Sequence, residues 1–325
     1  MLERADIMIT LYELTWSHYC EKVRLALDYM RLPWRAVSID AFKKEPLRAR
    51  PRPVHLPSYT VPAISDSRTN AYVMDSTPIL RYLAEAYPEA PQLFPGDAAH
   101  RAEVDAMLLD LDSRLGILAR RFAYTQVILE CPTLLPQLFL SQRVGGLYCA
   151  PGVRSVAGAF MGMVLTQRFE FHRSEELGMY EALEHYLLDL SATLERRPFV
   201  VGNTFSAADL TLAALLRPLT IVPFFAEHEG LRGLFERHRR VLTSELGYVE
   251  LAYQVAIREA RSRRAPVRRK LRQRDGSVPF APSEGSAAND QRRLWNWETV
   301  TIPVHYAYTL RRNKLRQREA SAEVR

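Results

Sequence analysis

Two serines stand where the sequence predicts that helices begin. Ser17 follows a short apolar run and precedes apolar residues at helical spacing, beginning with Val23. The free backbone N–H groups and the positive dipole end of such a helix start favour an anion, so Ser17 is a candidate site for anionic chemistry. Ser76 precedes Pro78 in a second helix start and reads as its cap. A serine at position 17 is also explained by helix capping alone, without any bound anion.

The cysteines, histidines and glycines give little indication of a catalytic, metal or nucleotide site. The three cysteines, Cys20, Cys131 and Cys149, contain no Cys-x-x-Cys pair, which argues against a disulfide framework or a zinc site. The eight histidines show no metal-ligand spacing, and no glycine-rich phosphate loop is present. We therefore expect no metal and no nucleotide, and a reducing, cytoplasmic location.

The elements that position Ser17 read as a strand, a helix and a strand. Residues 7–12 have the β-branched, aromatic and aliphatic content of a strand. Pro33 stops the helix that follows, and residues 34–39 alternate into a second strand. A unit of this kind, about 35 residues long, predicts two parallel strands.

The elements that position Ser76 read as a hairpin and a helix. Residues 61–64 and 71–74 are short strand patterns joined by a polar turn, and they close the sheet. Residues 43–58, rich in Lys, Arg and Pro, read as a loop before this hairpin. The first domain is therefore predicted over residues 1–90.

Beyond this point the pattern is helical. A proline-rich linker precedes apolar residues that recur at three and four spacing along residues 104–118 and 180–194. A helical bundle domain is predicted over residues 98–260. Residues 122–173 combine long apolar runs with prolines and paired glycines, and we expect them to be an insertion in this domain.

The length and the distribution of charge indicate two globular domains followed by a basic tail. The 325 residues suit two domains, and 47% hydrophobic with 25% charged residues is typical of a globular protein. Residues 261–325 hold 16 Lys and Arg against 6 Asp and Glu, which leaves 28 against 31 in the first 260 residues. We expect a basic, partly flexible tail whose charge run is solvated. The sequence gives no strong support for a nucleic-acid or membrane partner, and the N-terminus lacks a signal-peptide pattern.

Four stretches in this order resemble the cytosolic glutathione S-transferase family. They span residues 7 to about 260 and read Leu-Tyr-Glu-Leu-Thr-Trp-Ser-His-Tyr-Cys-Glu-Lys-Val-Arg-Leu-Ala-Leu from Leu11, Val-Pro-Ala-Ile from Val61, Asp-Ser-Thr-Pro-Ile-Leu-Arg-Tyr-Leu from Asp75, and Phe-Val-Val-Gly-Asn-Thr-Phe-Ser-Ala-Ala-Asp-Leu from Phe199. The resemblance implies an α/β plus all-α fold, with a thioredoxin-like βαβ-ββα domain followed by a helical bundle. It also implies a detoxification enzyme with glutathione as co-substrate.

The resemblance assigns roles by position. Ser17 would donate a hydrogen bond to the glutathione thiolate, which the helix start also stabilises. Val61, before a cis Pro62, would pair with the cysteinyl backbone of glutathione. Asp75 and Ser76 would hold its γ-glutamyl end, with Asp in place of the commoner Gln or Glu.

Other positions carry weaker expectations. Lys43 and Lys44 could meet the glycyl carboxylate, but a solvated charge cluster is the simpler reading. The motif of Ser206 and Asp209 reads as a structural capping box. An apolar electrophile would bind the helical domain, near residues 122–173 and with Tyr12, Trp16 and Tyr124 as contributors. Homodimerisation is common in the family, although the insertion and tail could block the usual interface.

Two rival functions remain open. Cys20 lies where glutaredoxin-like relatives carry the second thiol, so a glutathione-dependent thiol transferase or reductase is one alternative, although Cys20 also reads as a small buried residue. The other is a non-catalytic glutathione-binding or scaffold protein that keeps the fold without turnover.

Overall fold

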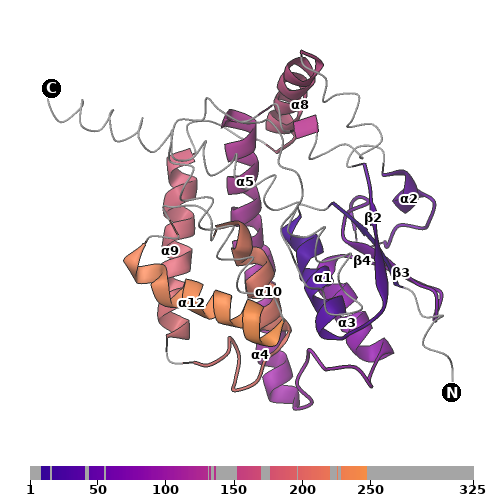
Figure 1. Cartoon of the computed structure of the whole chain (residues 1–325), viewed down its shortest axis with the longest axis vertical. Helices are drawn as coiled ribbons and strands as arrows, with labels where there is room; N and C mark the ends of the chain where they lie inside the picture. Colours follow the sequence, from indigo (N-terminus) through magenta and orange to yellow (C-terminus); the bar gives the residue numbers. More distant parts are fainter. Residues whose placement is uncertain are drawn as a thin grey trace, which may run out of the picture.

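A computed structural model describes residues 9–14, 17–40, 44–54, 56–130, 132, 135–136, 152–169, 176–195, 197–219, 225 and 228–246. In Figure 1 a small sheet with its helices stands on one side of the molecule and a group of longer helices on the other. The predicted tail, residues 261–325, lies outside the described residues.

In its described residues, the first unit contains four strands and three helices. In chain order they are β1 (Ile9–Glu13), α1 (His18–Tyr29), β2 (Trp34–Ser38), α2 (Glu45–Arg48), β3 (Ala63–Asp66), β4 (Ala71–Met74) and α3 (Ser76–Ala86). The sheet order is β2-β1-β3-β4, with β1 and β2 parallel and the other neighbours antiparallel. The predicted βαβ-ββα order is confirmed. Helices α1 and α3 cover the face of the sheet toward the longer helices, and α2 lies on the other side (Figure 1).

Local sequence explains the ends of these elements. Helix α1 begins after Ser17, whose side chain caps it, and ends before Arg31 adopts a φ of 55° ahead of Pro33. The one-turn helix α2 lies where the sequence predicts a loop, so that expectation was wrong. Pro46 stands at the start of α2, where a missing N–H costs nothing.

The second unit is helical throughout its described part. Its elements are α4 (Ala98–Asp110), the π-helical turn η1 (Leu111–Leu115), α5 (Gly116–Glu130), α8 (Val153–Phe169), α9 (Glu176–Leu194), α10 (Ala207–Leu216), η4 (Arg217–Leu219), η5 (Glu229–Leu231), α12 (Arg232–Arg240) and the π-helical turn η6 (Val241–Glu245). The predicted insertion, residues 122–173, contains the end of α5 and all of α8.

The two units share one hydrophobic core. It includes Leu11 and Leu80 from the first unit, and Leu111, Leu187 and Leu215 from the second. Every residue of α10 is buried, as its nearly unbroken apolar sequence requires, and α10 packs against α1. The relative position of the sheet and the helices is therefore fixed by burial.

The start of α10 confirms the structural reading of Asp209. Its carboxylate accepts from the backbone N–H of Ser206 at 3.1 Å and of Val200 at 2.8 Å, which completes a capping box. Burial raises the pKa of Asp209 to about 6. Among the described residues, no helix is long and apolar enough to cross a membrane.

Candidate active site

The N-terminus of α1 presents the hydroxyl of Ser17. The Ser17 N–H donates to the Leu14 carbonyl at 2.9 Å, which fixes the turn between β1 and α1. Ser17 Oγ accepts a long hydrogen bond of 3.4 Å from the Cys20 N–H, so Ser17 is the helix cap. This bond uses only a lone pair, and the hydroxyl proton is left for another acceptor. Capping and anion binding are compatible at this half-buried residue.

Cys20 is unsuited to thiolate chemistry. The side chain is fully buried on the first turn of α1. Burial, together with the nearby charge of Glu13, raises the pKa of the Cys20 thiol to about 12. A thiol that stays protonated and inaccessible is a poor nucleophile. The structure therefore favours the reading of Cys20 as a small core residue.

The backbone before β3 places Val61 beside the start of α3. The Val61–Pro62 peptide bond is cis, as the family resemblance implies. The Pro62 carbonyl accepts from the Asp75 N–H at 3.0 Å. This hydrogen bond joins the segment before β3 to the residue before α3, so Val61, Asp75 and Ser76 lie together.

The start of α3 differs from the expectation in one detail. Asp75, not Ser76, is the cap: its carboxylate accepts from the Ser76 N–H at 2.7 Å, and its own backbone has a φ of 77°. The expectation was wrong because Asp tolerates a left-handed backbone and caps as well as Ser does. Ser76 becomes the first residue of the helix, so its hydroxyl is not used as the cap.

Ser76 is the unusual residue of this region. It is 1% exposed, and its Oγ has no hydrogen-bond partner. A buried polar atom left unsatisfied costs about 1–3 kcal/mol, and such atoms are rare in folded proteins. Because it stands at a helix N-terminus, the Ser76 hydroxyl is placed to meet a bound anion.

A buried ion pair between α1 and η1 holds the first turn of α3 in place. Lys22 Nζ on α1 donates to Asp112 at 2.9 Å and 3.0 Å and to Thr77 Oγ1 at 2.5 Å. Thr77 in turn donates to Asp112 Oδ2 at 2.6 Å. Burial lowers the pKa of Lys22, although Asp112 opposes this shift. The cluster ties α1, α3 and η1 together one residue beyond Ser76.

A second buried network fixes α1 to the helical unit. Arg24 pairs with Glu13 on β1 and with Glu21, and Glu21 also pairs with Arg217 in η4. Burial would lower the pKa of Arg24, but Glu13 and Glu21 raise it above its ordinary value. These four charges neutralise one another in the interior.

The first turn of α1 also packs tightly on α5. The His18 ring nitrogen Nε2 lies 3.1 Å from the Gly116 carbonyl, and the Tyr19 hydroxyl donates to the Asp112 carbonyl at 2.9 Å. Burial and the positive charge of Arg120 lower the pKa of His18 to about 3, so the ring is neutral and Nε2–H is the donor. A Cβ at Gly116 would lie 2.2 Å from the Tyr19 hydroxyl oxygen, so a larger residue here would force the Tyr19 side chain to move away from the Asp112 carbonyl.

The remaining predicted contributors are only partly visible. Lys44 Nζ donates to the Tyr59 carbonyl at 2.5 Å, two residues before Val61. Tyr12 packs edge to face on Tyr72, with ring centroids 6.4 Å apart. Lys43, Trp16 and the side chain of Tyr124 lie outside the described residues.

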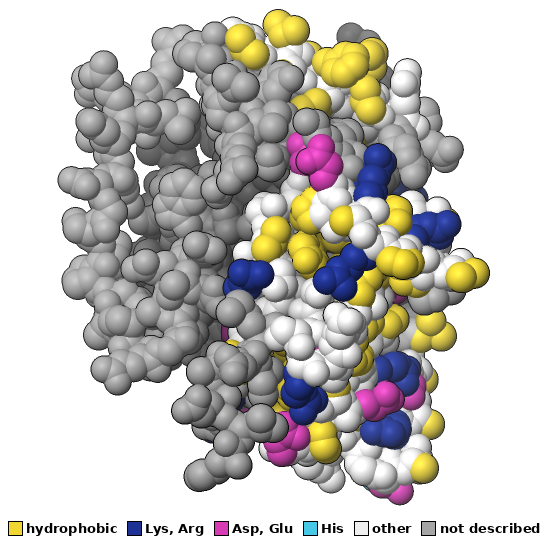
Figure 2. Space-filling view, turned by 90° about the vertical axis from the view of Figure 1, so that its right-hand side faces the viewer, with side chains coloured by type: hydrophobic (Ala, Val, Ile, Leu, Met, Phe, Trp, Pro, Cys, Tyr) yellow, Lys and Arg dark blue, Asp and Glu magenta, His cyan; other side chains and the backbone are white. Residues whose placement is uncertain are grey.

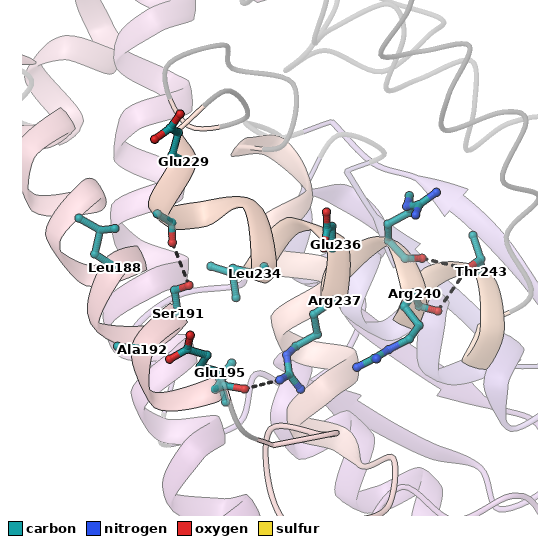
Figure 3. A pocket seen from close by; sticks show the side chains of 14 residues that line it. Leu188, Ser191, Ala192, Glu195, Glu229, Leu234, Glu236, Arg237, Arg240 and Thr243 are labelled. Atoms are coloured by element: carbon teal, nitrogen blue, oxygen red, sulfur yellow. Dashed lines mark hydrogen bonds between the residues drawn. The ribbon is translucent and has the colours of Figure 1, made fainter.

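A groove of about 880 Å³ lies elsewhere, between α9, η5 and α12 (Figure 3). Its arginines already have structural partners. Arg237 donates to the carbonyl of Leu194, the last residue of α9, and to that of Arg197 in the segment after it, where Arg240 donates to the Pro198 carbonyl at 3.2 Å. These bonds satisfy carbonyls at the C-terminus of α9 and in the segment after it, so we do not assign the active site to this groove.

A protein-family model matches the unit that contains Ser17, Val61, Asp75 and Ser76. Residues 11–91 match the family model for the glutathione S-transferase N-terminal domain, about a quarter of the chain. No curated protein sequence matches the chain significantly.

Three similar solved structures extend the likeness to the helical unit. They are a glutathione S-transferase from Rhodospirillum rubrum (23% identity, TM-score 0.50, 74% of this chain and 90% of that chain), a glutathione S-transferase of Ceriporiopsis subvermispora in complex with glutathione (19%, 0.51, 74% and 99%), and the beta-etherase LigF from a Sphingobium species (17%, 0.54, 78% and 99%). At these identities the likeness establishes the fold.

Proposed function

We propose that this chain, whose residues 11–91 form a glutathione S-transferase N-terminal domain on a fold shared with that family, binds glutathione and conjugates it to an apolar electrophile. In this proposal Val61 pairs with the cysteinyl backbone, and Asp75 and Ser76 hold the γ-glutamyl end. Ser17 holds the sulfur. Glutathione is the co-substrate, and the proposal needs no metal.

The observation that carries the proposal is the buried, unpartnered hydroxyl of Ser76. The γ-glutamyl end of glutathione bears a carboxylate and an ammonium. Ser76 Oγ would donate to the carboxylate at the N-terminus of α3, where the helix dipole favours a negative charge. The Asp75 carboxylate, one residue earlier, would accept from the ammonium. Both charged groups of the ligand then have a partner of the right kind.

The chemistry proposed at Ser17 is stabilisation of a thiolate. The glutathione thiol loses its proton to solvent, and the Ser17 O–H donates to the resulting sulfur anion. The sulfur lone pair then attacks the electrophilic carbon to form a C–S bond, and the leaving group departs with its electron pair. The free helix N–H groups near Ser17 add to the stabilisation of the anion.

The thiol-transferase rival is less well supported. It requires Cys20 as a thiolate on the surface, whereas Cys20 is buried and burial raises its pKa. The non-catalytic rival shares the glutathione site and differs only in turnover. The expected homodimer, cytoplasmic location and detoxification role remain proposals that accompany the enzyme assignment.

Calorimetric titration of glutathione into the full chain tests the binding part. Ser76→Ala should weaken binding about tenfold to a hundredfold, because a hydrogen bond to a charged group is worth about 1.5–3 kcal/mol. Ser244→Ala, an exposed serine in η6, is the control and should bind like the wild type. Equal affinity of Ser76→Ala and wild type would contradict the assigned subsite.

A panel of electrophilic and disulfide substrates tests the catalytic part. The proposal expects conjugation of at least one apolar electrophile, at a rate that depends on Ser17. Glutathione binding without turnover on any substrate would favour the non-catalytic reading, and turnover on disulfides alone that requires Cys20 would favour the thiol transferase.

A further inference from the structure

A half-buried arginine on α5, Arg120, has no acceptor for its guanidinium. Among the residues that the structure describes, none accepts a hydrogen bond from Arg120 or forms an ion pair with it. Exposed arginines need no partner because water solvates them, and Figure 2 shows Lys and Arg side chains spread over one face of the molecule. A charge that is partly withdrawn from water normally has a partner. Arg120 thus has N–H groups available for a bound ligand.

Arginines that hold the helical unit together differ from Arg120 in this respect. Arg217 in η4 pairs with Glu21, and Arg237 on α12 donates to the Pro198 carbonyl at 2.8 Å. Each of these guanidinium groups is fixed by an acceptor within the chain. A purely structural role therefore does not account for Arg120.

Helical spacing places Arg120 beside the first turn of α1. Gly116 lies one turn earlier on the same face of α5, and its carbonyl accepts from His18 Nε2 at 3.1 Å. The positive charge of Arg120 agrees with this placement. Burial lowers the pKa of His18 and Arg120 lowers it further, while burial raises the pKa of Tyr19 and Arg120 opposes that rise. Because α1 begins directly after Ser17, Arg120 lies at the same end of α1 as the candidate thiolate site.

An apolar side chain accompanies this charge on α5. Ile117 is 38% exposed and lies three residues before Arg120, so the two side chains are neighbours on the helix surface. This part of α5 therefore offers both a hydrocarbon side chain and a cation. A ligand that matches both is largely apolar and carries one anionic group.

The second substrate is the ligand that fits this position. In the proposed function, Asp75 and Ser76 hold the γ-glutamyl end of glutathione and Ser17 holds its sulfur, all from the first unit. Arg120 comes from the helical unit, where the electrophile is expected to bind.

We propose that Arg120 determines substrate specificity by binding a carboxylate on an otherwise apolar electrophile. A guanidinium binds a carboxylate through two parallel N–H···O bonds, which fix its orientation as well as its charge. This inference rests on the proposed function and deepens it, because it adds one negative charge to the second substrate.

Binding of two matched, unreactive compounds tests the proposal. Para-toluate and para-toluamide have the same ring and nearly the same size, and differ in one charge. In calorimetric titrations of the full chain without glutathione, the wild type should bind para-toluate more tightly. Arg120→Gln should weaken para-toluate binding about tenfold to a hundredfold, the range for a lost hydrogen bond to a charged group, and should leave para-toluamide binding within about twofold. Arg114→Gln, an exposed arginine that pairs with Asp110, is the control and should bind both compounds like the wild type.

Kinetics with glutathione connect this binding to the reaction. Para-carboxybenzyl chloride and para-carbamoylbenzyl chloride share the reactive carbon and differ in the same charge. The ratio of their kcat/KM values should fall about tenfold to a hundredfold in Arg120→Gln. Arg120→Lys, which keeps the charge without the guanidinium fork, should restore part of this ratio. A merely structural role would lower kcat/KM for both chlorides alike.

Three results would overturn the proposal. The first is equal affinity of the wild type for para-toluate and para-toluamide, and the second is an unchanged preference in Arg120→Gln. The third is weaker glutathione binding in Arg120→Gln with no change in that preference, which would assign Arg120 to glutathione. Absence of turnover on both chlorides would contradict the proposed conjugation, and the para-toluate titration would still decide the role of Arg120. A melting curve checks each fold, and Arg120→Met repeats the test if Arg120→Gln unfolds.

Discussion

The ion pair of Lys22 and Asp112 leads to an asymmetric prediction, because its partners are buried to different degrees. The Lys22 side chain is fully buried, whereas 24% of the Asp112 side chain is exposed. Asp112→Asn leaves a buried ammonium without the carboxylate that accepts its hydrogen bonds, and only the more distant charge of Asp75 remains. Lys22→Met leaves a carboxylate that reaches water and still accepts from the Thr77 hydroxyl at 2.6 Å. The first change should therefore be the more destabilising.

The structure sets the size of the two effects. Removing one partner of a buried ion pair costs about 3–5 kcal/mol. The ammonium left in Asp112→Asn can avoid a larger cost by losing its proton, which at pH 7 costs about 4.6 kcal/mol from an ordinary pKa of about 10.4. Asp112→Asn should therefore lower the free energy of unfolding by about 3–4.6 kcal/mol. Lys22→Met keeps most of the side-chain volume and should cost about 1–2 kcal/mol.

Urea unfolding at pH 7 and pH 9 measures both quantities. In the wild type the charge of Asp112 opposes the lowering of the Lys22 pKa by burial, so Asp112→Asn makes the folded-state pKa of Lys22 lower than it is in the wild type. The unfolded state thus binds more protons, and the stability deficit relative to wild type should shrink by up to about 1.4 kcal/mol per pH unit as the pH rises. A loss for Lys22→Met that equals or exceeds that of Asp112→Asn would refute this reasoning, as would a deficit in Asp112→Asn that grows with pH.

Three further predictions concern single residues. Cys20→Ser should leave kcat for conjugation almost unchanged, because the buried thiol does no chemistry; a large loss of kcat at wild-type stability would contradict this. Gly116→Ala should lower the free energy of unfolding by about 1–3 kcal/mol in urea titrations, because its Cβ would lie 2.2 Å from the Tyr19 oxygen. Burial lowers the pKa of His238 to about 4, so this residue's contribution is present above its ordinary pKa of 6.5 and is lost as the pH falls toward 4. The stability advantage of wild type over His238→Leu should therefore shrink by up to about 1.4 kcal/mol per pH unit between pH 6.5 and 4, and a constant difference would contradict it.

The order of elements could be predicted because each has a strong local signal. The β-branched, aromatic and aliphatic content marks β1, alternation marks β2, three and four spacing marks α9, and the Ser206 and Asp209 pair marks the start of α10. The resemblance of residues 11–27, 61–64 and 75–83 to a known family then placed the sheet. Local pattern failed at α2, a single turn that begins beside Pro46, and at Asp75, which caps α3 in place of Ser76.

The interior of the site could not be predicted, because its contacts join residues far apart in the chain. Lys22 and Asp112 are 90 residues apart, and His18 and Gly116 are 98 apart. A lysine in a helix reads as a solvated charge, and only the fold shows that Lys22 is buried. Gly116 in an otherwise helical pattern was the one available signal of a close approach. The unpartnered Ser76 hydroxyl likewise could not be predicted, because it depends on burial by the folded chain.

The thiol pKa of bound glutathione tests the central claim most directly. It can be read from the ultraviolet absorbance of the thiolate as the complex is titrated with base. The account predicts a pKa below the ordinary thiol value of about 8.5 in the wild type, and a rise of about one to two units in Ser17→Ala, since the lost hydrogen bond to the sulfur anion is worth about 1.5–3 kcal/mol. An ordinary pKa in wild-type complex, or the same pKa in both proteins, would contradict the assignment of Ser17 to the glutathione sulfur.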